Sequence, residues 1–336
     1  MKEDFNFYTP QQIAQVRLVF SQLIINSSED GNRFFEAYCP GNTIDIIDRP
    51  YERFEDYENF LKIIREDDQV KYEIIHKGTP FYFLAWSAFD LKNYEKAVFY
   101  MDAAISEDKR KDPRGWLENP AGRFLTLNHQ DVNQSAKRIT KFLSDKISAV
   151  LSRFNSITGN SPISVDNFVD KFVKKLVVEK KENNSIITAF YSYILEFDDR
   201  EKELSLRSTE GGSIEPTLTY LFKGGLIFES LLKYFYPKQD NGSDYRTLKD
   251  IFNTADFKSD FITITDISAS KLKEIVDAIG GNDLLTAFII SSKLRNTAGH
   301  NLVWDDVFNE SDNFKKLYEQ QVNAILYLIQ KKFLNP

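Results

Sequence analysis

Apolar residues recur at intervals of three and four along most of this 336-residue chain, which is the repeat of an amphipathic helix. The first clear stretch begins after Thr9-Pro10, a capping residue followed by proline at the first helical position. Its apolar stripe consists of Ile13, Val16, Phe20, Leu23 and Ile24. The sequence contains no strand followed by a glycine-rich turn and a helix, so it carries no Rossmann or P-loop signature. We therefore predict an all-α fold.

The same spacing predicts further helices, separated by short polar segments. They span residues 54–75, 135–155, 165–182, 184–206, 216–236, 244–254, 269–279, 282–296 and 313–333. Asp30-Gly31 is expected to end the first helix, and residues 38–50 and 109–134 are expected to be irregular because of their prolines and glycines. Residues 260–266 are the one place where a short strand or extended link is expected.

Residues 78–111 have the spacing of a single tetratricopeptide-like helical hairpin. Small side chains at Ala85, Ala97 and Ala104 allow two helices to approach closely, with a turn at residues 90–93. An ordinary helical hairpin fits the pattern equally well. Because one repeat cannot bury its own apolar face, we expect this hairpin to pack on other helices.

The length of the chain favours two domains. Residues 157–162 are small and polar and contain Gly159 and Pro162, so we place the boundary there. This divides the chain into an N-terminal helical domain over 1–157 and a C-terminal helical bundle over 160–336.

Composition excludes several classes of protein. Lysine and arginine number 43 against 50 aspartates and glutamates, and the net charge of −7 disfavours a broad basic surface that coats nucleic acid. A local grip on a few phosphates is still compatible with this charge. One cysteine and three histidines predict neither a disulfide framework nor a metal centre, and no cofactor is expected. Without a signal peptide or an apolar stretch of about 18 residues, the chain is expected to be cytoplasmic and free of membrane spans.

Residues 291–301 carry the clearest chemistry, with the sequence Ser-Ser-Lys-Leu-Arg-Asn-Thr-Ala-Gly-His-Asn. Arg295 offers a planar fork of donors that matches a phosphate, and His300 can exchange a proton near neutral pH. Asn296 can hold a phosphate or ribose oxygen, or orient the other two side chains. Together they could activate a 2′-hydroxyl of RNA, stabilise charge on phosphorus and protonate the leaving oxygen. The alternative is a structural arginine and a capping or solvated histidine.

The spacing of this motif adds a geometric requirement. Arg295 and His300 are five residues apart, which is about 140° around an unbroken helix, so they would not share a face. A helix end near 296–299, with Gly299 free to adopt a positive φ, would let them converge. Two copies of the motif that meet across a two-fold axis would have the same effect. We expect both a helix end there and a dimer contact nearby.

An arginine, four intervening residues and a histidine on a late helix of a bundle resemble the ribonuclease motif of the HEPN superfamily (higher eukaryotes and prokaryotes nucleotide-binding). The segment 222–233 resembles an earlier helix of that bundle, and the likeness covers residues 160–336. It implies a metal-independent endoribonuclease with His300 as acid and base, Arg295 on the phosphate and Asn296 in support, at a composite site in a homodimer.

Members of this superfamily occur in antiviral, CRISPR-associated and toxin–antitoxin systems. The toxins that are silenced by adenylylation carry tyrosine where this chain has Leu302, and the Rossmann-like sensor domain of the CRISPR effectors that sense cyclic oligoadenylate is not visible here. The resemblance therefore leaves the regulatory input open, and the N-terminal half is expected to bind a partner, or a protein or nucleotide activator.

Three further residues are candidates for binding. Glu229 could hydrogen-bond Arg295 and preset its fork, although a surface or buried pair elsewhere is the commoner arrangement. Lys293 could bind phosphate, although a solvated lysine is the default. Trp304 could stack on a base, although an aromatic at such a position more often lies in a core or an interface.

Two other functions are compatible with the sequence. The C-terminal bundle could be a non-catalytic HEPN-like module that binds nucleotide, RNA or a protein. The chain could instead be a helical adaptor that binds a peptide with the 78–111 hairpin.

The other two histidines, His76 and His129, lack a matching catalytic or metal-binding partner in the sequence. We expect them to be structural or exposed.

Overall fold

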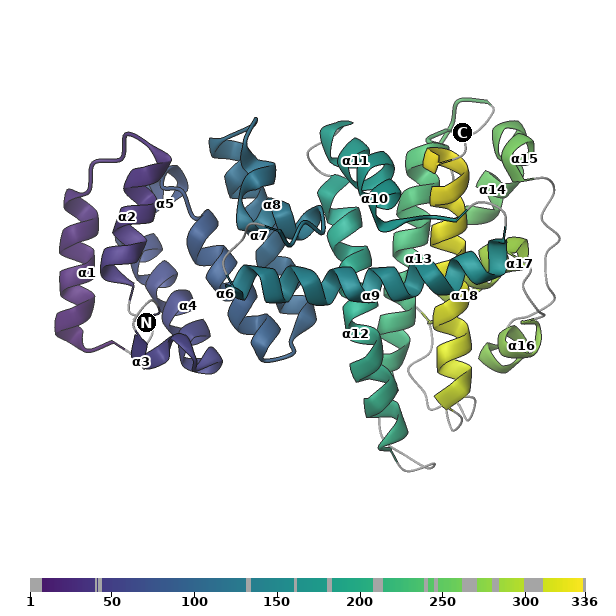
Figure 1. The fold of residues 1–336 in the computed structure, drawn as a ribbon, viewed down its shortest axis with the longest axis horizontal. Coiled ribbons are helices and arrows are strands. Elements are labelled where there is room, and N and C mark those ends of the chain that lie inside the picture. The colour runs from purple at the N-terminus through teal and green to yellow at the C-terminus, as the bar shows by residue number, and fades with distance from the viewer. Residues whose placement is uncertain are drawn as a thin grey trace. The chain divides into compact units, whose positions relative to one another are not determined.

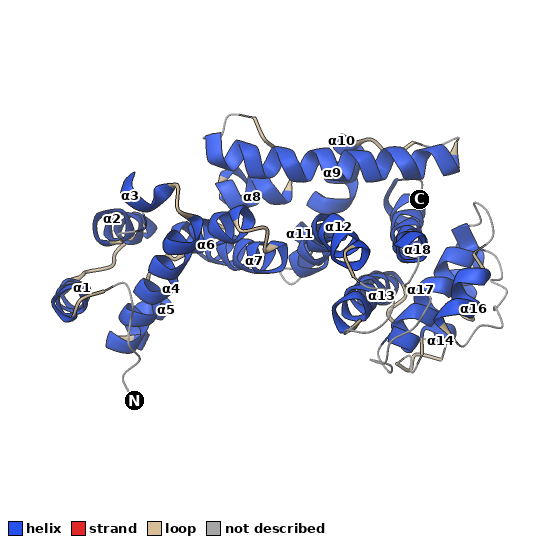
Figure 2. Cartoon of the chain, turned by 90° about the horizontal axis from the view of Figure 1, so that it is seen from below, coloured by secondary structure: helices blue, strands red, loops and turns tan. Residues whose placement is uncertain are grey.

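The fold is that of a computed structural model. It describes residues 8–39, 41, 44–130, 134–159, 162–179, 183–207, 214–238, 241–244, 247–261, 271–279, 284–298 and 311–334. Within them the chain is helical and contains no strand (Figure 2), so the predicted all-α class is confirmed. No helix in these ranges is both long and apolar enough to span a bilayer. By its internal packing the chain divides into Met1–Leu143 and Ser144–Pro336.

The N-terminal unit is a series of helices joined by short connections (Figure 1). They are α1 (Pro10–Gln22), α2 (Ser28–Tyr38), α3 (Ile44–Ile47), α4 (Pro50–Asp67), α5 (Gln69–Ile74), α6 (Gly78–Asp90), α7 (Tyr94–Lys111), α8 (Pro120–Leu125) and the first half of α9 (Gln134–Thr158). The helix start predicted at Thr9-Pro10 is confirmed, because the Thr9 hydroxyl accepts a hydrogen bond from the Gln12 backbone N–H at 3.2 Å.

Helices α6 and α7 form the hairpin that the spacing predicts. The three alanines are buried, and the chain turns at Leu91 and Lys92 before Asn93 caps α7 through the Lys96 backbone N–H. The hairpin packs on α4, where the rings of Tyr57 and Phe83 stack with centroids 5.2 Å apart. Its likeness to a tetratricopeptide repeat stays a prediction.

The helix end predicted at Asp30-Gly31 is wrong, because both residues lie inside α2. The break comes earlier, where Ser27 precedes α2 and its backbone N–H donates to the Asp30 carboxylate at 2.8 Å. A Cβ on Gly31 would lie 2.9 Å from the backbone oxygen of His76. This glycine therefore permits close packing and does not end a helix.

Capping side chains explain the other local differences in this unit. The single helix predicted over 54–75 is two helices, because the Asp68 side chain accepts from the Lys71 backbone N–H at 2.9 Å and starts α5. The segments expected to be irregular contain α3, α8 and a 3₁₀ turn at Trp116–Glu118, and Pro120 occupies the first turn of α8.

The C-terminal unit is a helical bundle. Its elements are the second half of α9, α10 (Val165–Asn167) with a π turn at Phe168–Val173, α11 (Lys174–Glu179), α12 (Asn184–Ser205), α13 (Glu215–Phe235), α14 (Leu248–Phe252), α15 (Ala255–Phe261), α16 (Leu272–Asp277), α17 (Leu284–Ala298) and α18 (Ser311–Ile329) with a π turn at Gln330–Leu334. Helices α12, α13 and α18 lie side by side, and α17 packs on α13 and α18 (Figures 1 and 2).

The second half of α9 lies across this bundle. Arg153 pairs with Glu319 of α18 at 2.8 Å, and Lys146 pairs with Asp198 of α12. Helix α9 ends at Thr158, and Gly159 has a φ of +64°, which only glycine adopts without strain. The division of the chain falls within α9, so the domain limits 1–157 and 160–336 stay a prediction.

The expected extended segment at 260–266 begins as a helix. Asp260 and Phe261 are the last residues of α15, and residues 262–270 lie outside the described ranges. The reason is aromatic packing, because the ring of Phe261 is buried 5.0 Å from that of Phe288.

Phe288 of α17 is at the centre of an aromatic cluster that joins α13, α15 and α18. Its fully buried ring lies 5.2 Å from Phe228 and 5.7 Å from Tyr327, in addition to its contact with Phe261. Phe288 thus helps to anchor the helix that carries Arg295, together with the buried Ile290 and Leu294 of the same helix.

We expect Phe288→Ala to lower the free energy of unfolding of the C-terminal unit by about 3–5 kcal/mol, because it removes the ring and leaves a cavity. Urea denaturation followed by far-ultraviolet circular dichroism measures the change. The control is Leu206→Ala, since that side chain is 76% exposed and its loss should change stability by about 0.5 kcal/mol or less. Equal effects of the two substitutions would contradict the assignment of Phe288 to the core.

Candidate functional site

Helix α17 presents the arginine–asparagine pair at its C-terminal end. Ser291 and Leu294 are fully buried, and the Ser291 hydroxyl donates to the Ala287 carbonyl at 2.8 Å. Arg295 is partly exposed and Asn296 is exposed. The apolar side of the helix therefore fixes its rotation, and that rotation turns the polar side chains outward.

Glu229 of α13 holds Arg295. The Arg295 Nε donates to Glu229 Oε2 at 2.8 Å, and Lys233 Nζ donates to the other carboxylate oxygen at 2.6 Å. The hydrogen bond between Glu229 and Arg295 that was considered from the sequence is thus present. The side chain of Glu229 is 12% exposed while that of Arg295 is 37% exposed, so a largely buried carboxylate fixes a more accessible guanidinium.

The close approach of α13 and α17 allows the hydrogen bond between Arg295 and Glu229 to form. A Cβ on Gly225 would lie 2.7 Å from the Cβ of Arg295 and 3.0 Å from its Cα, which is closer than real Cβ atoms approach. Only glycine fits at this point without a shift of the helices. Glu229 lies one turn further along α13, so the glycine brings its carboxylate within reach of the arginine.

Glu229 is ionised across the neutral range. Burial by itself raises the pKa of this carboxyl, but the hydrogen bonds and positive charges of Lys233 and Arg295 outweigh burial and lower the pKa below its ordinary value. The three side chains together carry one net positive charge, which suits the binding of an anion.

The terminal nitrogens of Arg295 are oriented and still available. Nη1 donates to Asn296 Oδ1 at 3.3 Å, and Nη2 has no partner among the described residues. With Nε held by Glu229, these two nitrogens are the part of the fork that remains for a ligand.

Lys293 and Asn296 line a separate small cavity between α17 and α14. It has a volume of about 140 Å³, and Ser292 and Asn253 contribute further polar groups. A water molecule occupies about 30 Å³ of liquid, so this cavity holds a few waters or one phosphate-sized group and is too small for a nucleotide. Arg295 does not line this cavity, although its Nη1 reaches the side chain of Asn296.

The structure therefore brings Arg295, Asn296 and Glu229 together. Lys293 lies apart from Arg295 and Glu229 and lines the neighbouring cavity with Asn296. His300 and Trp304 lie outside the described residues, so their places at the site stay predictions. The last described residue of α17 is Ala298, and the helix end expected near 296–299 is likewise untested.

Sequence reasoning missed Lys233, which shares the Glu229 carboxylate. Its spacing of four residues after Glu229 on one helix was the available signal, because such pairs face each other. Among the described residues, no three histidine, cysteine, aspartate or glutamate side chains are placed to hold a metal ion.

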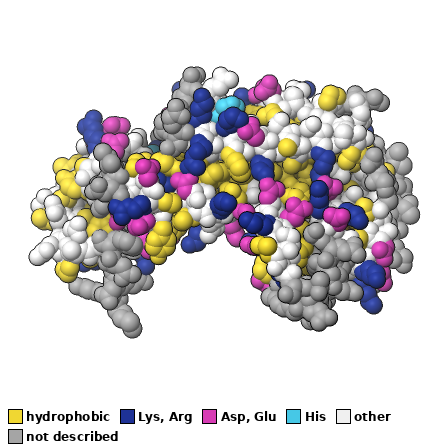
Figure 3. All heavy atoms as spheres, turned by 60° about the horizontal axis from the view of Figure 1, so that its bottom comes forward, with side chains coloured by type: hydrophobic (Ala, Val, Ile, Leu, Met, Phe, Trp, Pro, Cys, Tyr) yellow, Lys and Arg dark blue, Asp and Glu magenta, His cyan; other side chains and the backbone are white. Residues whose placement is uncertain are grey.

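The charge on the surface is mixed. On the face drawn in Figure 3, lysine and arginine side chains are interspersed with aspartate and glutamate among hydrophobic ones. The described part of that face shows no broad basic field. An anion would accordingly be bound by a few specific groups, as at Arg295.

Comparison of the chain with protein-family models, with curated proteins and with solved structures finds no match. What the structure establishes is an all-helical fold, and the resemblance to the HEPN superfamily stays a hypothesis that depends on the residues of the motif.

We expect Glu229→Gln to lower the free energy of unfolding at pH 7 by about 1 kcal/mol, a modest value because solvent screens the partly exposed cations. Because the folded-state pKa of Glu229 is lowered, its contribution is present above the ordinary carboxyl pKa of 4.5 and is lost as the pH falls through the folded value. The difference between wild type and variant should therefore shrink on acidification.

Urea denaturation at a series of pH values from neutral to acid measures this difference. The control is Glu203→Gln, which removes an exposed ion pair with Arg200 on α12 and should change stability less. A gap between wild type and Glu229→Gln that stays constant over the whole pH range would contradict the ion pair.

Proposed function

We propose that this chain is a metal-independent endoribonuclease of the HEPN type. The observation that supports the proposal best is the arginine of the motif held at Nε by the largely buried Glu229 carboxylate, 2.8 Å away. A guanidinium fixed before the substrate arrives stabilises charge on phosphorus without reorganisation during the reaction. An arginine that served only as a surface charge would not need a buried partner.

In the proposed reaction, His300 removes the proton of the RNA 2′-hydroxyl, and the resulting oxygen attacks the adjacent phosphorus. The bond from phosphorus to the 5′-oxygen of the next nucleotide breaks, and the leaving oxygen takes from His300 the proton that His300 removed. The products are a 2′,3′-cyclic phosphate and a free 5′-hydroxyl. Arg295 stabilises the charge on the phosphoryl oxygens, and Asn296 positions the guanidinium or a substrate oxygen.

The remaining candidates fit subsidiary roles in the same reaction. Lys293 lies one helical turn from the motif and would bind a neighbouring phosphate, and Trp304 would stack on a base. The resemblance implies a homodimer in which two copies of the motif form one site, an arrangement that the motif spacing allows. By its resemblance the protein would be a regulated effector in antiviral, CRISPR-associated or toxin-type defence, with the activator bound by the N-terminal half.

We expect His300→Ala and Arg295→Ala each to reduce RNA cleavage by about 100-fold or more, because each removes a group that acts in the transition state. Cleavage is measured on mixed RNA with purified protein and on total RNA from cells that express it. Wild-type cleavage should continue in the presence of a chelator, and the products should end in 2′,3′-cyclic phosphate.

Matched controls separate catalysis from folding. His129→Ala removes another histidine, and Arg200→Ala removes an arginine that is also paired with a glutamate on a helix of the C-terminal unit, at 2.9 Å. Both should retain cleavage. Undiminished cleavage by His300→Ala, or no cleavage by wild type in either assay, would overturn the ribonuclease proposal.

The same variants distinguish the second function weighed from the sequence. A non-catalytic binding module predicts that Arg295→Ala weakens RNA association while no product ever forms. The oligomeric state is tested by analytical ultracentrifugation, since an active protein that stays monomeric would contradict the composite site and leave the ribonuclease assignment intact.

A further inference from the structure

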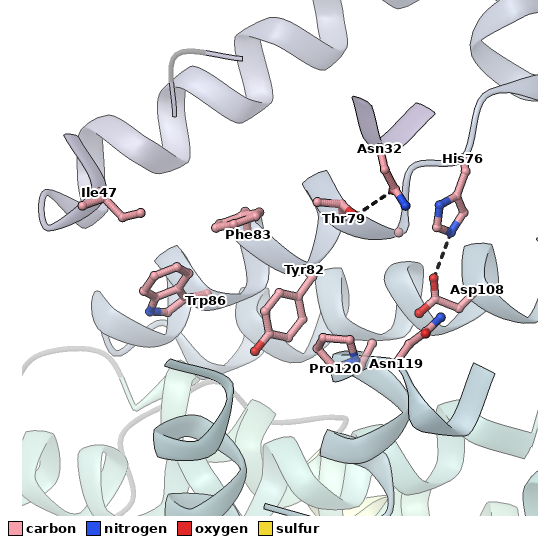
Figure 4. A pocket seen from close by; sticks show the side chains of 12 residues that line it. Asn32, Ile47, His76, Thr79, Tyr82, Phe83, Trp86, Asp108, Asn119 and Pro120 are labelled. Carbon is pink, nitrogen blue, oxygen red and sulfur yellow. Dashed lines mark hydrogen bonds and ion pairs between the residues drawn. The ribbon is translucent and has the colours of Figure 1, made fainter. Parts of the chain in front are cut away.

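The N-terminal unit contains a cavity of about 520 Å³ whose lining lies entirely within residues 32–121 (Figure 4). This volume is in the range of small-molecule sites, roughly 300–1,000 Å³. The described residues that line it come from α2, α3, α6 with the residue His76 before it, α7, and the start of α8 with Asn119 before it.

One side of the cavity is aromatic. Tyr82, Phe83 and Trp86 follow one another on α6, and the centroids of the Phe83 and Trp86 rings are 5.5 Å apart. Phe83 and Trp86 are only partly buried. Their rings are tilted by 36°, and Tyr57 covers one face of Phe83 while Arg53 covers one face of Trp86. A flat ligand can therefore stack on the remaining face of one ring and meet the other at its edge.

The other side is polar (Figure 4). His76 Nε2 and Asp108 Oδ1 are 2.9 Å apart, and both residues are more than nine-tenths buried. Thr79 donates to Asn32 at 3.0 Å, which leaves the Asn32 amide nitrogen without a partner among the described residues. The second carboxylate oxygen of Asp108 points toward Asn119.

Two polar atoms of lining residues, one on each side of the cavity, are unsatisfied. His76 Nδ1 and Trp86 Nε1 are buried and have no hydrogen-bond partner among the described residues. A buried polar group without a partner is destabilising by about 1–3 kcal/mol.

The charge of the described lining disfavours an anionic ligand. Among the described residues that line the cavity, Asp108 is the only carboxylate and none is lysine or arginine. Arg53 stacks on the ring of Trp86 at 4.0 Å, but its nitrogens donate to Ser87 and Asp90 at 2.7 and 2.9 Å and to the Ile47 carbonyl. The described lining therefore offers no lysine or arginine to a phosphate, whereas Asp108 can accept from an N–H group.

From this arrangement we infer that the cavity binds a planar nitrogen heterocycle without a phosphate, a purine base or its nucleoside. The ring stacks on Phe83 with Trp86 at its edge, and an N–H donor of the ligand meets the second oxygen of Asp108. The inference is independent of the ribonuclease proposal, because it uses no residue of the C-terminal unit. If the inference holds, the ligand of the N-terminal half is a molecule without a phosphate and not the nucleotide considered from the sequence.

Isothermal titration calorimetry of the full chain with guanosine and with adenosine tests the inference. We expect at least one of them to bind and to change the fluorescence of Trp86, a signal that Trp86→Phe removes. The 5′-monophosphate of the nucleoside that binds should bind no more tightly, because the described lining offers it no lysine or arginine. Asp108→Asn should weaken binding about tenfold or more.

Because Asp108 is buried against His76, its variant could lose stability, so Phe83→Leu provides a second test. Phe83→Leu keeps an apolar side chain but removes the stacking face, and it should weaken binding by several-fold. Glu95→Gln is the matched control, since it removes one exposed carboxylate on the same helix as Asp108 and should leave the affinity unchanged.

Three outcomes overturn the inference. They are the absence of binding by both nucleosides at millimolar concentration, binding that neither Asp108→Asn nor Phe83→Leu weakens, and binding of the monophosphate more than tenfold tighter than that of the nucleoside. Loss of binding in the two variants together with retention in Glu95→Gln supports it.

Discussion

The close approach of α13 and α17 at Gly225 is the constraint on which the candidate site depends. A larger residue there would collide with the Cβ of Arg295, so the two helices can meet only across a glycine. That contact places Glu229 beside Arg295, and the ring of Phe288 on α17 packs on Phe228 of α13 in the same interface. A small residue at one point and a large one at another thus both contribute to the position of the arginine.

The N-terminal unit uses a different combination of forces. Its hairpin packs through aromatic rings and alanines, while ionised side chains occupy defined places beside the cavity. Arg53 is bonded through all of its nitrogen groups and also covers Trp86, so it contributes structure and leaves no free charge. Asp108 instead keeps one oxygen directed toward Asn119. The two units therefore offer opposite electrostatics, a net positive group at Arg295 and a single carboxylate in the cavity.

Local sequence rules predicted the helices well where the reason for a helix start was local. Thr9 and Pro10 mark the start of α1, and the alanines of the hairpin are buried as expected. The rules failed where a capping side chain or a tertiary packing contact determined where a helix begins, breaks or ends. Asp68 divides a predicted single helix, and Gly31 lies inside a helix because it meets the backbone of His76. The end of α15 is helical because Phe261 is needed in the aromatic cluster.

By itself the sequence determined the all-helical class and the residue types of the motif, because apolar spacing and side-chain chemistry are properties of neighbouring positions. It could propose that Glu229 meets Arg295, but it could not decide between that pair and another. Only the tertiary structure joins these two side chains, which are 66 positions apart, because the join depends on how two helices pack. The cavity beside His76 depends on packing in the same way, since its described walls come from five separate segments that no local pattern relates.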